Sequence, residues 1–280
     1  MTAQAAPVNH NLSEKTLFDV LREVWRAKLY MLIFAVLMAI FAFSFLTLAK
    51  PYYRAQMIIT PASPMGHALS DRGGMQEGTL QIQREDFMSN AAFQRFENIY
   101  NGVSVANFLL QDEDIINGFA ADRMFEFSNP YTPESAEAMS AYLRDRVILE
   151  PVSGTPLRRL IYMHPNKEYA MDLLARVHRL TDEMIRARIL VETNQRIDYL
   201  NVAMTKTQNP DHRRSITGLL MEQERLKMMV SLDQPYAAGI VEPAYVSAQP
   251  KWPDPYVLYP VFIFIGLLMG FVVHGLKHNA

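Results

Sequence analysis

The sequence predicts an α+β membrane protein, in which two transmembrane helices flank an α/β base that carries a long antiparallel helical hairpin. Three observations predict this class. Apolar runs lie near both ends of the chain, at 29–49 and 256–276. Segments rich in β-branched and aromatic residues adjoin both runs. Between them, 166–207 contains neither glycine nor proline and has a helical apolar pattern.

Both apolar runs are long enough to cross a membrane. A bilayer core is about 30 Å thick and a helix rises about 1.5 Å per residue, so about 20 apolar residues span it. The polar tail 1–28 precedes the first run, which favours a retained anchor over a secretory signal peptide with an apolar region of about 7–15 residues. We therefore expect transmembrane helices at 29–49 and 256–276.

The basic residues predict the orientation. Lys15, Arg22 and Arg26 lie in the tail 1–28, and Lys277 lies in the tail 277–280. Positive residues beside a span stay on the cytoplasmic side, whereas long loops cross regardless of their charge. We therefore place both tails in the cytoplasm and 50–255 in the periplasm of a bacterium with two membranes.

Composition excludes several classes of function. The chain has no cysteine, which removes disulfides and thiolate chemistry. A net charge of −2 provides no broad basic field for nucleic acid. No Walker phosphate loop, no His-Glu-x-x-His zinc helix and no Gly-x-Ser-x-Gly elbow occurs. We predict no catalytic residue, no cofactor and no metal site, and we expect the acidic run 112–114 and the arginine pairs 158–159 and 213–214 to be surface groups.

Local patterns predict the elements of the middle region. In the tail 1–28, Ser13 is the expected N-cap of a short amphipathic helix. The other expectations are a strand at 52–60, a loop at 63–79, helices at 85–100, 105–119 and 133–143, two strands at 146–150 and 159–163 joined by a turn at 152–156, and a return strand at 236–246. The first and last strands are expected to pair.

The helical hairpin is predicted at about 166–231. Asn166 is the expected N-cap of its first helix, and Asn209-Pro210-Asp211 separates the two helices. A short connection between amphipathic helices implies antiparallel packing. Apolar residues of the first helix alternate in steps of four and three, as in a heptad seam. These residues are Leu173, Val177, Leu180, Met184, Ala187 and Val191.

The second apolar run carries a packing motif, Gly266-x-x-x-Gly270. Glycines four residues apart let helices approach closely in lipid, and Ala35 and Ala39 of the first run have the same spacing. Prolines crowd the entry to the second run, and a kink is expected at its outer end. The entry residues are Pro250, Lys251, Pro253, Pro255 and Pro260.

These pieces together resemble a Wzz-type chain-length determinant, a polysaccharide co-polymerase. The strand 53–59 directly after the first run, the junction 160–165 leading into the long helix, the pair Pro250-Lys251 and the Gly266-x-x-x-Gly270 motif carry the resemblance. The spacing from Pro250-Lys251 to the first glycine is looser than the family pattern. No kinase domain follows the second run, so the chain resembles the kinase-free branch.

The resemblance implies a non-enzymatic oligomer of the bacterial inner membrane. Such proteins regulate the chain length or export of O-antigen, capsule or exopolysaccharide together with a polymerase. The implied partners are further copies of the chain in a ring, the growing polysaccharide, membrane lipid, and a separate tyrosine kinase or an outer-membrane exporter. We expect an oligomer seam at Leu173, Val177, Leu180, Met184 and Val191.

Two other classes of protein remain open at this point. A two-span periplasmic sensor would need a cytoplasmic output domain, and few residues follow the second run. An envelope adaptor usually has one span and a longer coiled coil. An enzyme acting on envelope glycans would need an acid/base pair, and no such pair is evident in the sequence.

Overall fold

The computed structural model describes the backbone of residues 17–62 and 90–279 and the side chains of 25–62 and 90–277. These residues form two compact units. One contains the two ends of the chain, up to Ala49 and from Pro253, and the other contains Lys50–Trp252. The predicted cap at Ser13, the loop 63–79 and the start of the helix at 85–100 lie outside the described residues.

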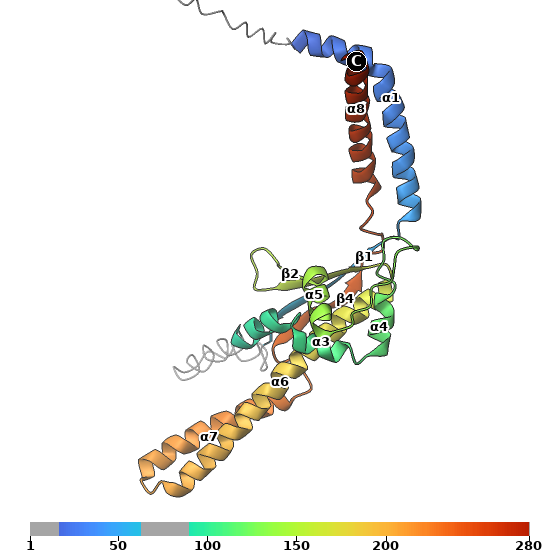
Figure 1. Cartoon of the computed structure of the whole chain (residues 1–280). Helices are drawn as coiled ribbons and strands as arrows, with labels where there is room; N and C mark the ends of the chain where they lie inside the picture. The colour runs from blue at the N-terminus through green and yellow to red at the C-terminus, as the bar shows by residue number, and fades with distance from the viewer. Residues whose placement is uncertain (1–16, 63–89, 280) are drawn as a thin grey trace, which may run out of the picture. The chain divides into compact units, whose positions relative to one another are not determined.

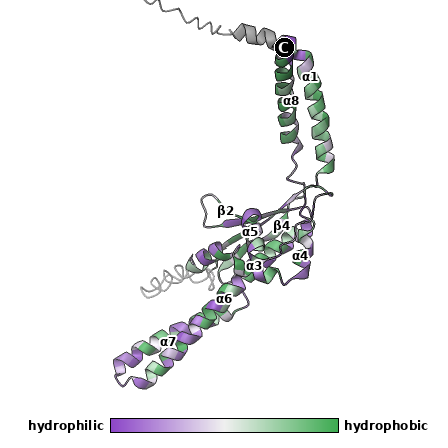
Figure 2. Ribbon diagram, in the orientation of Figure 1, coloured by the Kyte–Doolittle hydropathy of each residue, from purple (hydrophilic) through white to green (hydrophobic). Residues whose placement is uncertain are grey.

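The unit made from the chain ends is a pair of helices, α1 (Leu17–Leu48) and α8 (Pro255–Asn279), packed side by side (Figure 1). Both are long and apolar enough to cross a membrane, over Trp25–Leu48 and Pro255–Lys277. Figure 2 shows that apolar residues cover most of both helices. The predicted tail helix and first span are therefore one continuous helix. Pro260 lies inside α8.

The other unit contains a four-stranded antiparallel sheet in the order β2-β3-β1-β4. Its strands are β1 (Tyr53–Pro61), β2 (Ile148–Pro151), β3 (Arg158–His164) and β4 (Ala238–Val246). In β1, alternate side chains at Ala55, Met57 and Ile59 are buried, as the period of two in a strand requires. The first and last strands pair, as predicted, and β2 and β3 form the predicted hairpin.

Helices cover this sheet (Figure 1). Residues 90–99 are helical, followed by α3 (Val103–Leu109), α4 (Glu113–Phe119) and α5 (Ala136–Arg146). The prediction of one helix at 105–119 is wrong, because Asp112 caps a new helix by accepting a hydrogen bond from Asp114 N at 3.1 Å. Together the sheet and helices enclose one core, in which the largest buried side chains include Phe96, Phe119, Met139, Leu143, Leu160, Tyr162, Leu173 and Leu174.

The hairpin consists of α6 (Lys167–Lys206) and α7 (Pro210–Ser231). Asn166 caps α6 by accepting from Tyr169 N at 3.1 Å, and Asn209 caps α7 by accepting from Asp211 N at 2.9 Å. Pro210 occupies the first turn of α7, where its missing N–H costs nothing. A helix of 40 residues is about 60 Å long, so α6 extends well past the sheet that its first turns cover.

Candidate functional site

The glycine motif of α8 packs against α1. A Cβ atom built on Gly266 would lie 2.7 Å from Phe34 O and 2.9 Å from Ala35 Cα. One built on Gly270 would lie 2.5 Å from Met31 Cα. No larger residue fits at either position without moving α1. Gly275 on the same helix has nothing within 4 Å of its built Cβ.

The structure therefore brings part of the predicted packing set together. Ala35 lies against Gly266, whereas the atoms nearest to Gly270 belong to Tyr30 and Met31 rather than to Ala39. Since the helices run antiparallel, successive small residues of α1 move away from Gly270. The glycine face is occupied by a helix of the same chain.

The proline-rich entry lies in both units, with Pro250 and Lys251 in the second unit and Pro253, Pro255 and Pro260 in the first. In the second unit, Lys251 N donates to Tyr52 O at 2.8 Å, and Tyr52 N donates to Trp252 O at 2.8 Å. The rings of Tyr52 and Trp252 meet edge to face at 5.8 Å. The two segments that adjoin α1 and α8 are thus hydrogen-bonded to each other.

Tyr52 is also anchored to a buried carboxylate, Asp122, which the sequence did not reveal. Asp122 accepts hydrogen bonds from Tyr52 OH at 2.9 Å and from Tyr142 OH at 2.6 Å. Arg146 Nη2 lies 3.8 Å from the same carboxylate. Burial raises the pKa of both phenols, and the charge of Asp122 raises them further, so both remain protonated donors. The network ties β1, the segment after α4 and α5 together.

The predicted oligomer seam is wrong for Leu173 and Val177. Both side chains are completely buried in the core of their own chain. Leu180 and Met184 are partly buried against that core, and Val191 is 57% exposed. The first half of α6 covers a sheet and other helices at once, so these residues have no surface to offer another protomer.

Exposed apolar side chains gather instead on the outer part of the hairpin. Figure 2 shows α7 and the distal part of α6 with apolar and polar residues interspersed. Only Leu226 and Val230 are buried in α7. The exposed apolar residues of this region are Val191, Tyr199, Val202, Leu219, Met221 and Met228, and we call them the hairpin surface. Such a set of large apolar side chains is typical of an interaction surface.

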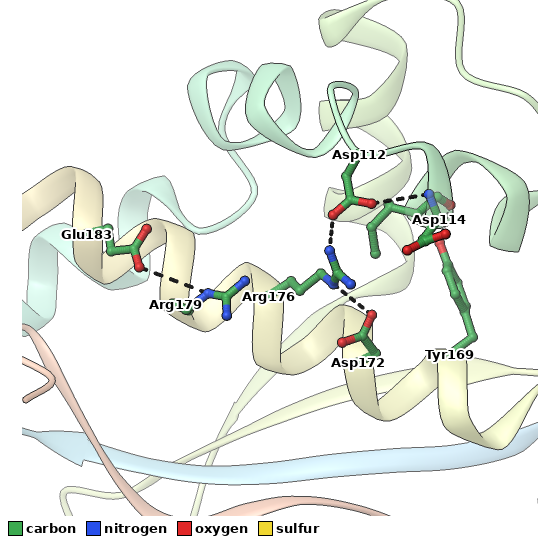
Figure 3. A network of polar contacts seen from close by, with 8 residues as sticks. Asp112, Asp114, Tyr169, Asp172, Arg176, Arg179 and Glu183 are labelled. Carbon is green, nitrogen blue, oxygen red and sulfur yellow. Dashed lines mark hydrogen bonds and ion pairs between the residues drawn. The ribbon is translucent and has the colours of Figure 1, made fainter.

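A network of ion pairs joins α6 to the start of α4 (Figure 3). Arg176 pairs with Asp112 and, at 2.7 Å, with Asp172. Arg179 and Glu183 form a second pair at 4.0 Å. Asp112 therefore both caps a helix and holds α6, which explains the acidic run at 112–114 as structural.

A clasp, formed by Asp182 and Arg186 of α6, lies where the hairpin leaves the sheet. Asp182 Oδ1 accepts from Tyr236 N at 2.9 Å and from Ala237 N at 2.7 Å. Arg186 donates to Leu232 O at 2.8 Å, and its Nε lies 3.2 Å from Asp182 Oδ2. The clasp fixes the segment that leads from α7 into β4.

The arginine pairs differ in their surroundings. Arg158 Nε bonds Glu97 at 2.6 Å, whereas Arg214 is exposed and lies 3.7 Å from Asp211. The buried Asp122 and Asp182 are the residues that sequence reasoning missed. Their partners lie far away in the chain, so no local spacing signals them; the abundance of tyrosine, with 13 in the chain, was the one available hint.

The architecture defines a class of protein, in which two membrane-length helices enclose an α+β domain with a long helical hairpin. Residues 13–112 match the family model described as Wzz, chain length determinant protein. The resemblance to Wzz chain-length determinants is thereby confirmed over this part of the chain. No curated protein matches the sequence.

Two solved structures are similar to the chain at low sequence identity. The first is a full-length bacterial polysaccharide co-polymerase, at 12% identity and a TM-score of 0.48, covering 94% of this chain and 97% of the other. The second is a fragment of WzzB, a polysaccharide co-polymerase from Salmonella Typhimurium, at 11% identity and a TM-score of 0.41, covering 72% of this chain and 100% of the other.

Proposed function

We propose that this protein is a non-enzymatic regulator of the chain length or export of a bacterial surface polysaccharide. The observation that carries the proposal is the match of residues 13–112 to the chain length determinant family. The matched region includes α1 and β1, and the described chain ends in a second helix of membrane length. The polymer is O-antigen, capsule or exopolysaccharide, and the protein acts with a polymerase.

The proposed location is the inner membrane, with α1 and α8 as its two spans. The basic residues beside the spans support cytoplasmic ends. The unit Lys50–Trp252 then lies in the periplasm, where it meets the growing polysaccharide. A separate kinase or an outer-membrane exporter is a further partner of this arrangement.

We propose further that the chain self-associates through the hairpin surface. Buried side chains hold the first half of α6 within the chain, but Tyr199 is 73% exposed and Met221 is 69% exposed. Large apolar side chains in these positions are buried favourably by a second copy. This replaces the predicted seam by residues farther along α6 and on α7.

Deleting the gene tests the proposed function. The length distribution of the polysaccharide, separated on a gel, is expected to broaden or lose its preferred length while total sugar is retained. Reintroducing the wild-type gene restores the distribution. An unchanged distribution in the deletion strain contradicts the proposal.

The hairpin surface has its own test. Tyr199→Ser with Met221→Ser removes two exposed apolar side chains, so the detergent-solubilised protein is expected to shift from a large oligomer to smaller species. The matched control is Arg214→Ser, an exposed hairpin side chain outside that surface. An oligomer of unchanged size in the double variant excludes this surface as the contact.

The glycine face is proposed to hold the two spans together. Gly266→Leu or Gly270→Leu introduces a side chain where α1 backbone already lies, so the helices must separate. A crosslink between cysteines introduced at Leu32 and Leu268, in an otherwise cysteine-free chain, is expected to change its yield. Gly275→Leu, made where space is open, leaves the yield unchanged. Equal yields in all three variants contradict the proposal.

A further inference from the structure

The charges of the α1–α8 pair are separated between its two ends. Among the described side chains of this unit, the cations Arg26, Lys28 and Lys277 lie at one end, and the carboxylate of Asp254 lies at the other. Upstream in the sequence, Asp19 and Glu23 are offset by Lys15 and Arg22. One end of the helix pair is therefore basic.

Side chains from both helices build this basic end. Lys277 Nζ of α8 donates to Tyr30 OH of α1 at 3.0 Å, and it lies 5.5 Å from the centre of the same ring. The His274 and Tyr30 rings are 5.5 Å apart. Residues separated by almost the whole chain thus form one cluster, which exists only when the two helices are paired.

The aromatic side chains hold cations at the surface of the pair. Lys28 Nζ lies 4.9 Å from the ring centre of Trp25, and Trp25 is 72% exposed. Its neighbour Leu29 is 64% exposed. Tryptophan and tyrosine favour the headgroup level of a bilayer, and lysine reaches from there toward phosphate.

None of the three cations forms an ion pair within the described side chains. Their charge is thus available to an external anion. Both helices are long and apolar enough to cross a membrane, and the cluster lies at the end of both. The anion that lies at this depth in every bacterial membrane is the phosphate of an anionic phospholipid.

We propose that Lys28 and Lys277, with Arg26, Trp25 and Tyr30, form a binding site for the phosphate of an anionic phospholipid. The lipid bridges the ends of α1 and α8 and so stabilises their pairing. The proposal depends on the two-span placement given above, but not on any role in polysaccharide length. A normal polymer profile in a deletion strain would leave it intact.

The test uses the full-length protein in detergent and native mass spectrometry. The protein is titrated with phosphatidylglycerol or with phosphatidylcholine of the same acyl chains. Phosphatidylglycerol is expected to bind preferentially. Lys28→Gln and Lys277→Gln are each expected to weaken its binding about fivefold, the share of one basic side chain at a membrane surface.

Three controls make the result decisive. Lys28→Arg and Lys277→Arg keep the charge and are expected to bind as the wild type does. Lys251→Gln removes a lysine from the other unit and is expected to have no effect. Tyr30→Phe removes the hydroxyl that holds Lys277 and is expected to weaken binding by a smaller factor.

Several outcomes would overturn the proposal. Equal binding of the two lipids removes the role of charge. An unchanged affinity in both glutamine variants, or an equal loss in Lys251→Gln, removes the assignment to this end of the pair. Displacement of the lipid by inorganic phosphate at matched concentration indicates a simple anion site instead of a lipid site.

Discussion

The two parts of the second unit, the base and the hairpin, are stabilised in different ways although α6 belongs to both. The base comprises the sheet, the helices of 90–146 and α6 as far as Ile185; the hairpin comprises the rest of α6 and α7. In the base, α6 buries pairs of neighbours in successive turns, Leu173 with Leu174, Val177 with His178, and Thr181 with Asp182. In the hairpin it buries one residue per turn.

This difference shows how a single helix can serve two purposes. A wide buried face fixes the first half of α6 to the sheet and leaves nothing for a partner. A narrow buried face, with Ile189, Thr193 and Ile197 against Leu226 and Val230 as the buried side chains, lets α7 cover only part of the second half. The uncovered apolar side chains are the ones we assign to self-association. The base is thus the rigid part and the hairpin the adaptable part.

The clasp at the boundary is the place where the comparison is broken most strongly. Asp182→Ala leaves the buried N–H groups of Tyr236 and Ala237 without an acceptor, at a cost of about 1–3 kcal/mol for each group. We expect hydrogen exchange to accelerate in both base and hairpin, since the segment joining α7 to β4 is released. The free energy of unfolding in urea gives the total.

Asp182→Asn separates the two functions of this side chain. An asparagine oxygen can still accept from both N–H groups, while the attraction between Arg186 and Asp182 Oδ2 is lost. We expect a smaller loss than in Asp182→Ala. If the two variants are equally unstable, the ion pair rather than the turn is the main contribution.

A pair of core truncations tests the difference directly. Leu174 is completely buried in the base, and Leu174→Ala is expected to cost about 3–5 kcal/mol in the free energy of unfolding. Ile197→Ala in the hairpin is expected to cost less, because two helices can close around the gap more easily than a filled core. Urea denaturation of both variants measures the difference.

Hydrogen exchange shows where each truncation acts. Leu174→Ala should raise exchange throughout the unit, and Ile197→Ala should raise it in the distal part of α6 and in α7 alone. Uniform exchange in the second variant would mean that base and hairpin unfold as one, and the comparison would fail.

The sequence revealed what depends on neighbours in the chain. The caps Asn166 and Asn209, the two membrane-length helices and the hairpin of β2 and β3 each follow from a few adjacent residues. The seam was misassigned for a physical reason. A stripe of apolar residues identifies a buried face, but whether the same chain or another copy buries it depends on the sheet that α6 covers.

The candidate site shows the same division. The Gly266 and Gly270 spacing indicated a packing face, yet the residues facing it depend on the offset between two helices, which placed Met31 where Ala39 was expected. Asp122 gave no signal, because Tyr52 and Tyr142 approach it from distant parts of the chain. Interactions between distant residues arise from the tertiary fold and leave no periodicity.

Acid should affect the base selectively. Burial lowers the pKa of His178 and of His164, so the folded base binds protons less readily than the unfolded chain does. His178 Nε2 donates to Ala238 O at 2.8 Å, and the nearby charge of Asp182 opposes the burial effect in part. Stability is therefore complete above the unfolded pKa of about 6.5 and falls as the pH drops below it.

Thermal unfolding between pH 7.5 and 5.5 measures this dependence, and His178→Gln serves as the matched variant. Glutamine can donate to Ala238 O but does not titrate, so the midpoint should depend less steeply on pH. An equally steep dependence in the variant would assign the acid sensitivity to other groups.

The smallest expected effects have opposite signs in the two regions. Gly218 lies inside α7 with nothing within 4 Å of a built Cβ, so Gly218→Ala should stabilise the hairpin by about 0.5–1 kcal/mol, the helical penalty of glycine. Gly154 in the turn between β2 and β3 has φ of 75°, so Gly154→Ala should destabilise the base by about 1–2 kcal/mol. Exchange rates in α7 and in β2 measure the two changes separately. A slower exchange in α7 without any change in oligomer size would show that the hairpin associates through its exposed side chains rather than through its flexibility, whereas a simultaneous change in size would make helix stability itself part of assembly.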